Sequence, residues 1–182
     1  EFSLDGEQLF LRTLSEDNRI IRIFGGDGKE LRSIGINQEF CQSQNRICGE
    51  EAYSFDINSN GQEVVFSRLD GSIQLAQFPE KLSRFSSENP LINSLSPEIT
   101  TFSGHSGRID IVTLSPDGTA IVSAGRDGRV KVWDLQGNEI IVSTENTQYP
   151  GQDVPFYYNL DISPDNQMIA LSGAGAVVKI VD

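Results

Sequence analysis

The stretch SAGRDGRVKVWD, residues 123–134, places an Asp-Gly pair between two apolar runs and ends with the only tryptophan of the chain. Asp-Gly favours a tight turn between antiparallel strands, because glycine readily adopts the positive φ that such turns require. The run after the pair is rich in valine, which packs well on a pleated sheet. The stretch therefore predicts a β-hairpin.

This hairpin belongs to a repeated unit. Residues 110–134 align without gaps with residues 158–182 and, in the other direction, with residues 53–77. A looser copy occupies the start of the chain. The first turn of each copy carries a turn-forming pair: Asp5-Gly6, Asn60-Gly61, Asp117-Gly118 and Asp165-Asn166. Self-similarity of this kind is the signature of a repeat architecture.

Each copy predicts four short strands separated by turns. In the third strand apolar and polar residues alternate, with Val130 and Val132 beside Lys131 and Asp134. A further turn and a fourth apolar run follow, at residues 31–34 and 140–143 in two copies. Because no long window shows helical periodicity, we expect an all-β, antiparallel fold.

The chain divides into four repeats joined by two long connections. We place the repeats at about residues 1–34, 53–103, 104–143 and 156–182, and the long connections at about residues 35–52 and 79–98. Connections of this length are either surface decoration or functional insertions. The first holds Cys41 and Cys48, which form either a small disulfide loop or two free thiols.

Charge and composition exclude several classes of function. The formal net charge of −12, without any Lys/Arg cluster, repels phosphate backbones and anionic lipid headgroups. No apolar run approaches the roughly 18 residues of a membrane helix, and no secretory signal opens the sequence. One histidine and two cysteines cannot make a four-ligand zinc site without carboxylates. We expect a cytoplasmic protein with no metal, no cofactor, no nucleic acid and no membrane.

The copy from Gly104-His105 to Trp133-Asp134 resembles the repeat of WD-repeat β-propellers over its full length. It has a Gly-His before the first strand, a Ser-Pro-Asp-Gly turn, a serine on the second strand, an aspartate in the second turn and the final Trp-Asp. The other copies are degenerate, with Phe24, Ala76 and Val181 at the tryptophan position. The run VWDLQGNEI, residues 132–140, is similar to WD-repeat proteins of cyanobacteria.

The resemblance implies a structural hydrogen-bond set of four side chains inside one blade: His105, Ser123, Asp127 and Trp133. A buried indole N–H and a buried hydroxyl need partners, and an aspartate held in a turn can accept from an imidazole. The alternative is a catalytic Ser-His-Asp set. Because Ser123 sits in the middle of a strand and would point into packed β-structure, we favour the structural role.

The resemblance also implies a face that binds proteins, formed by the loops before the first strand and by the second turn. Its candidate residues combine aromatic rings, arginines and carboxylates: Glu51, Tyr53, Leu69, Arg108, Asp110, Arg126, Phe156 and Tyr158. These residue types dominate protein-binding hot spots. The alternative is that they are ordinary loop residues.

Four repeats make only part of a propeller ring, since rings of seven or eight blades are common in the family. We expect either an excerpt of a longer protein or a second copy that completes the ring. The predicted function is a non-enzymatic scaffold that binds a protein or peptide. The alternatives are the propeller of a hydrolase and a sensor or regulatory domain attached to a signalling or effector protein. The sequence contains no nucleophile elbow and no phosphate-binding loop that would support an enzyme.

Overall fold

The fold consists of strands throughout the part of the chain that the structure describes. This computed structural model describes residues 8–14, 19–25, 27–35, 52–58, 62–78, 97–143, 157–173 and 178–181. No helix occurs within these ranges. The predicted all-β, antiparallel fold is confirmed.

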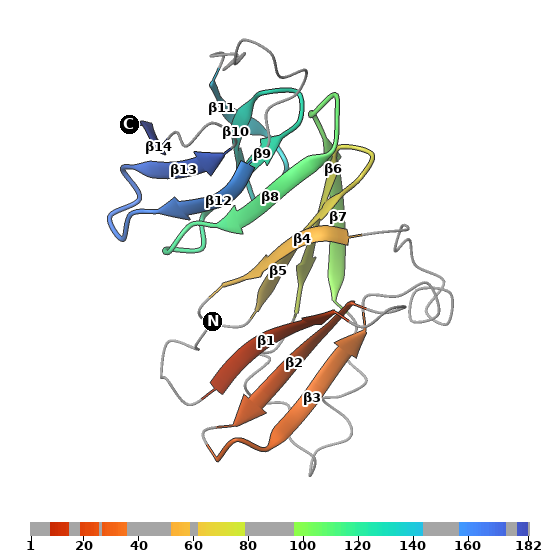
Figure 1. The fold of residues 1–182 in the computed structure, drawn as a ribbon. Helices are drawn as coiled ribbons and strands as arrows, with labels where there is room; N and C mark the ends of the chain where they lie inside the picture. The colour runs from red at the N-terminus through yellow and green to blue at the C-terminus, as the bar shows by residue number, and fades with distance from the viewer. Residues whose placement is uncertain are drawn as a thin grey trace.

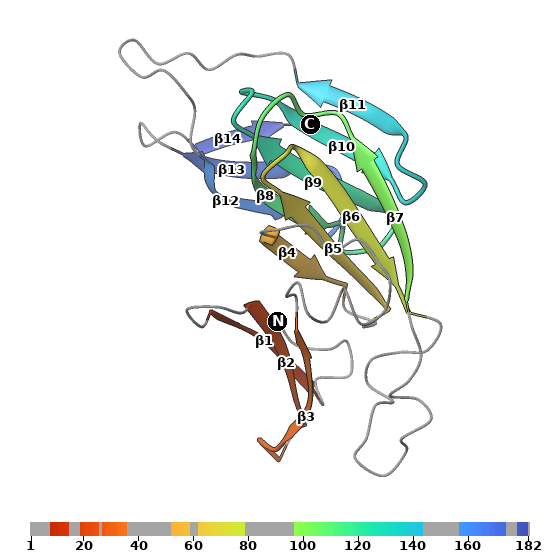
Figure 2. The same ribbon diagram turned by 90° about the vertical axis from the view of Figure 1, so that its right-hand side faces the viewer.

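The strands form four antiparallel sheets that follow one another in chain order (Figures 1 and 2). The first sheet contains β1 (Gln8–Leu14), β2 (Arg19–Gly25) and β3 (Glu30–Gly35). The second sheet contains β4 (Ala52–Ile57), β5 (Glu63–Arg68), β6 (Ser72–Gln77) and β7 (Glu98–Ser103). The third sheet contains β8 (Ile109–Leu114), β9 (Ala120–Gly125), β10 (Val130–Asp134) and β11 (Glu139–Ser143). The fourth sheet contains β12 (Tyr157–Ile162), β13 (Ile169–Gly173) and β14 (Val178–Val181).

The turns form where the repeated Asp-Gly and Asp-Asn pairs predict them. Gly118 and Asn166, in the first turns of the third and fourth sheets, have φ of 71° and 60°. A short polar side chain such as asparagine tolerates this left-handed conformation better than most residues do. Ser115 Oγ donates to Asp117 at 2.6 Å and accepts from the backbone N–H of Ala120 at 2.9 Å. The Ser-Pro-Asp sequence thus stabilises its own turn through local hydrogen bonds.

The hydrophobic core lies between successive sheets. One buried cluster joins the second and third sheets: Val65, Ile73, Leu75, Phe102, Ile109, Val112, Leu114, Ile121 and Trp133. A second joins the third and fourth sheets: Val122, Ala124, Val130, Leu160 and Leu171. The third sheet is therefore covered on both faces.

This stacking buries residues of both kinds in β10, where apolar and polar residues alternate. Lys131 is only 3% exposed, and Val130 is also buried. Neighbouring sheets cover both faces of the third sheet, so Lys131 lies in the protein interior. The ammonium of Lys131 forms an ion pair with Glu139 on β11.

The edge strands β4, β8 and β12 bring the second, third and fourth sheets together. Strand β8 contacts both β4 and β12. The carboxylate of Asp56 on β4 accepts from the Thr113 hydroxyl at 2.6 Å and from the Leu114 backbone N–H at 2.8 Å, both on β8. These hydrogen bonds join two sheets through strands that are not paired with each other. They lie near the carboxyl ends of β4 and β8.

Candidate functional site

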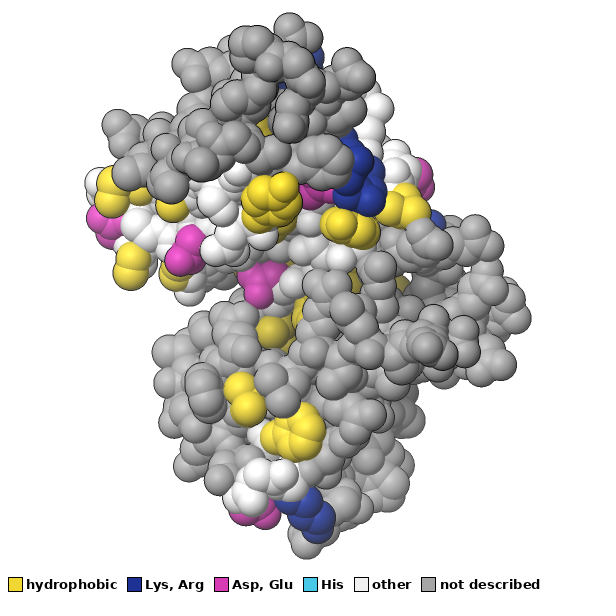
Figure 3. Space-filling model, viewed as in Figure 1, with side chains coloured by type: hydrophobic (Ala, Val, Ile, Leu, Met, Phe, Trp, Pro, Cys, Tyr) yellow, Lys and Arg dark blue, Asp and Glu magenta, His cyan; other side chains and the backbone are white. Residues whose placement is uncertain are grey.

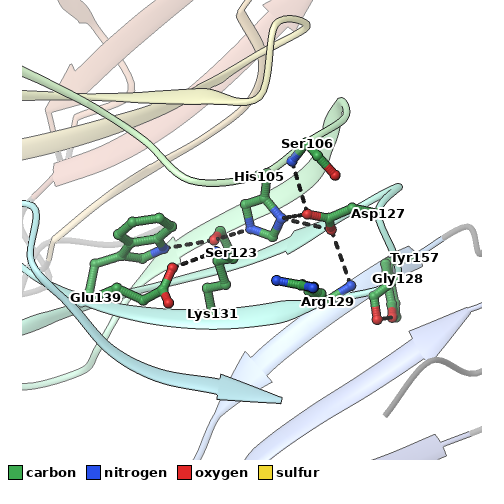
Figure 4. A network of polar contacts seen from close by, with 10 residues as sticks. His105, Ser106, Ser123, Asp127, Gly128, Arg129, Lys131, Glu139 and Tyr157 are labelled. Carbon is green, nitrogen blue, oxygen red and sulfur yellow. Dashed lines mark hydrogen bonds and ion pairs between the residues drawn. The ribbon is translucent and has the colours of Figure 1, made fainter. Parts of the chain in front are cut away.

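Four side chains of the third sheet and its loops form a chain of hydrogen bonds. Trp133 Nε1 donates to Ser123 Oγ at 2.8 Å, and Ser123 Oγ lies 2.8 Å from His105 Nε2. His105 Nδ1 lies 2.9 Å and 3.0 Å from the two carboxylate oxygens of Asp127. Figure 4 shows His105 lying between Ser123 and Asp127. The chain connects β10, β9, the loop before β8 and the β9–β10 turn.

The direction of these hydrogen bonds follows from the donors available. Burial lowers the pKa of His105, and this outweighs the opposing effect of Asp127, so the imidazole is neutral near pH 7. Ser123 accepts from the indole and can donate its own hydrogen to Nε2. The imidazole then carries its hydrogen on Nδ1 and donates it to Asp127. Every donor in this set therefore has an acceptor within the set.

Asp127 also stabilises the two loops next to this set of hydrogen bonds. Its carboxylate accepts from the backbone N–H groups of Ser106 and Arg129, each at 3.1 Å. Burial would raise the pKa of Asp127, but the hydrogen bonds from His105 and from these amides lower it overall. Asp127 is therefore an ionised anchor for two loops at physiological pH.

The environment of the Ser-His-Asp group does not resemble a hydrolytic centre. Ser123 is 0% exposed, and the His105 side chain is also fully covered. The Ser123 hydroxyl already accepts a hydrogen bond from Trp133, which leaves less electron density for nucleophilic attack. A substrate could reach this serine only if the sheets separated.

A second polar cluster lies at the beginning of β8. Arg108 Nε and Nη2 donate to Asp110 Oδ1 at 2.9 Å and 2.7 Å, and Arg126 Nε donates to the same oxygen at 3.1 Å. The guanidinium carbon of Arg108 lies 3.9 Å from the centre of the Tyr53 ring. The structure thus brings together four of the eight residues predicted for the binding face.

A pocket of about 620 Å³ opens beside this cluster, between β4, β8 and β12. Tyr53, Asp110 and Tyr158 are among its lining residues. Tyr158 is 71% exposed, and Leu69 in the β5–β6 turn is 38% exposed. Figure 3 shows Lys and Arg side chains bordered by hydrophobic ones on this side of the molecule. Glu51 and Phe156 lie outside the described residues.

Two features of the region were not predicted from the sequence. Asp56 links β4 to β8, and Lys131 is buried beside Trp133, with its ammonium 5.4 Å from the indole ring centre. A signal for the second feature exists, because Gln74, Lys131 and Lys179 occupy the same position of three repeats. A polar residue that recurs in a strand of the core indicates a buried polar contact.

The described ranges contain neither a metal-binding cluster nor a membrane-spanning helix. No group of three or more His, Cys, Asp or Glu side chains there is placed to hold a metal ion. The described part of the chain also contains no helix with the length and apolarity needed to cross a membrane.

Residues 96–134 match the family model of the WD domain, G-beta repeat. The match begins just before β7, the last strand of the second sheet, and ends with β10, the third strand of the third sheet. One sequence repeat therefore contributes strands to two sheets. The WD-repeat family is supported by this match for one repeat of the chain.

Relatives with similar segments support the same family. Protein HIR1 of Kluyveromyces lactis is 30% identical over 89 residues, which are 48% of this chain and 10% of that protein. The small ribosomal subunit protein RACK1 of Candida albicans is 48% identical over 44 residues, 24% of this chain and 14% of that protein. RACK1 of Caenorhabditis elegans is 32% identical over 83 residues, 46% of this chain and 23% of that protein. The chain spans less than a quarter of each relative. The number of repeats and the likeness to cyanobacterial proteins stay predictions.

Proposed function

We propose that this chain is a non-enzymatic protein-interaction scaffold made of WD-repeat blades, and that it binds a protein or peptide where β4, β8 and β12 begin. The observation that carries the proposal is the cluster of Tyr53, Arg108 and Asp110 beside the pocket of about 620 Å³. An arginine held in one rotamer next to a partly exposed tyrosine is typical of a binding hot spot.

The hydrogen-bonded side chains of His105, Ser123, Asp127 and Trp133 are proposed to stabilise their blade and to perform no chemistry. Their burial and their complete hydrogen bonding support this role over a catalytic one. Without this chain, a hydroxyl, an imidazole and an indole N–H would be buried without partners, at a cost of about 1–3 kcal/mol each.

The remaining blades of a ring are proposed to come from further repeats or from a second copy of the chain. Light scattering separates these sources, because a monomer at micromolar concentration excludes the second copy. A cytoplasmic location, and the absence of nucleic acid, membrane and cofactor as partners, stay predictions.

A peptide selection on the immobilised full chain tests the proposed function. Selected peptides are then titrated against wild type, Tyr158→Ala and Met168→Ala. Both side chains are exposed, but Met168 lies in the β12–β13 connection, beyond the end of β12 opposite Tyr158. We expect Tyr158→Ala to weaken binding and Met168→Ala to leave it unchanged. Equal affinities, or turnover in a hydrolase screen, would contradict the proposal.

A further inference from the structure

Arg108 is held in place from two sides. One edge of its guanidinium, Nε with Nη2, points at Asp110 Oδ1, and the flat face lies on the Tyr53 ring. These contacts fix the rotamer before any ligand arrives. Binding to this guanidinium therefore costs little side-chain entropy.

The other edge of the same guanidinium has no partner among the described residues. Arg108 is 24% exposed, and its contacts leave Nη1 and the second N–H of Nη2 without an acceptor in that part of the chain. Two parallel N–H groups match the two oxygens of a carboxylate. The guanidinium of Arg108 is thus preorganised for bidentate binding of an oxyanion.

The local charge favours an anion over a cation. The open edge of Arg108 presents only N–H donors of a guanidinium that keeps its positive charge, so it attracts an anionic acceptor. The overall charge of −12 acts at longer range and is screened beyond about 10 Å at 0.1 M salt. A ligand cation would also find one face of Tyr53 already occupied by Arg108.

Apolar side chains flank this position. Exposed Tyr158 and Leu69 lie at the beginning of β12 and in the β5–β6 turn, and that turn packs against the loop of residues 105–107 that leads to Arg108. We infer that the binding face takes an acidic peptide, with an Asp or Glu carboxylate on the open edge of Arg108 and apolar neighbours against Tyr158 and Leu69. This inference rests on the proposed function.

The test is a fluorescence titration of the full chain with labelled peptides of equal length. The peptides carry a central Glu, Gln, Lys or phosphoserine between apolar residues. We expect the Glu peptide to bind at least about tenfold more tightly than the Gln and Lys peptides, because only a carboxylate pairs both of its oxygens with the two N–H groups and carries the opposite charge.

Variants of Arg108 locate the site. Arg108→Gln is expected to weaken binding of the Glu peptide at least about tenfold. Arg108→Lys keeps the charge but loses the fork, so we expect it to restore only part of the affinity. Lys29→Gln removes the same charge from an exposed position in the β2–β3 turn and is expected to change affinity less than twofold. Trp133 fluorescence checks that each variant is folded.

The outcomes separate this inference from the proposed function. If Gln or Lys peptides bind as tightly as Glu peptides, and Tyr158→Ala weakens them, the face binds peptides but the acidic preference is wrong. If only the phosphoserine peptide binds, the carboxylate assignment is wrong. If none of the peptides binds and the peptide selection also fails, both proposals fall.

Discussion

The third sheet (β8–β11) and the second sheet (β4–β7) share one repeat pattern but fill corresponding positions with different side chains. Where the third sheet has Ser123 and Trp133, the second has Phe66 and Ala76. Phe66 lies beside Phe55, with ring centres 6.2 Å apart. The same framework therefore accepts either a polar chain or an aromatic pair.

The aspartate of the second turn shows the difference most clearly. Within the described residues, Asp70 in the second sheet accepts from its near neighbour Ser72, through Oγ at 2.6 Å and the backbone N–H at 2.9 Å. These bonds lower its pKa. Asp127 in the third sheet instead reaches His105, which lies 22 residues earlier in the chain. One aspartate stabilises a turn, and the other ties a turn to a distant loop.

The largest effect should come from Trp133→Ala. This change gives the third sheet the residue that the second sheet has naturally, but in a pocket shaped for an indole between His105 and Phe102. We expect a loss of about 3–5 kcal/mol in the free energy of unfolding, because a large cavity would remain. Urea unfolding followed by circular dichroism measures it. A loss below about 1 kcal/mol would mean that the third sheet repacks as the second does.

His105→Ala should have the next largest effect. It leaves Ser123 and the Asp127 carboxylate short of a partner, and we expect a loss of about 1–3 kcal/mol. Thermal unfolding measures it. Unchanged thermal stability would show that the chain of hydrogen bonds does not hold the blade.

The pH dependence of stability should also separate the two sheets. The pKa of His105 is lowered by burial, so an unfolded chain takes up a proton near pH 6.5 while the folded chain does not. Stability should therefore fall as pH drops from 7 toward 5. His105→Gln should flatten this slope, since the chain has no other histidine. Urea unfolding across this range checks it, and identical slopes for both proteins would contradict the account.

The smallest effect should come from Ser72→Ala in the second sheet. It removes one local hydrogen bond to Asp70 and keeps the bond from the backbone N–H. We expect a loss below about 1.5 kcal/mol, smaller than that of His105→Ala. A larger loss in the same thermal assay would reverse the comparison.

The antiparallel strands and their turns could be predicted because their signals are local. Asp-Gly and Asp-Asn pairs set φ within a few residues, so Gly118 and Asn166 have the positive φ that the pattern indicates. The polar set around His105 could be proposed only because one repeat resembles a known family. Its counterparts at Phe66 and Ala76 give no such pattern.

Contacts between sheets could not be predicted because they depend on how the sheets stack. The carboxylate of Asp56 meets Thr113 across 57 residues, and the ring of Tyr53 meets Arg108 from another sheet. Burial of Lys131 likewise follows because neighbouring sheets pack against both faces of the third sheet. Sequence alternation describes one strand and does not count its neighbouring sheets.

Hydrogen exchange across the two sheets tests the central claim most directly. We expect the hydrogen-bonded side chains of Trp133, Ser123, His105 and Asp127 to add stability that the second sheet lacks. The expected result is slower amide exchange in β9 and β10 than in β5 and β6, and loss of that difference in His105→Ala. Equal protection of the two sheets in the wild type, or a difference that survives His105→Ala, would contradict it.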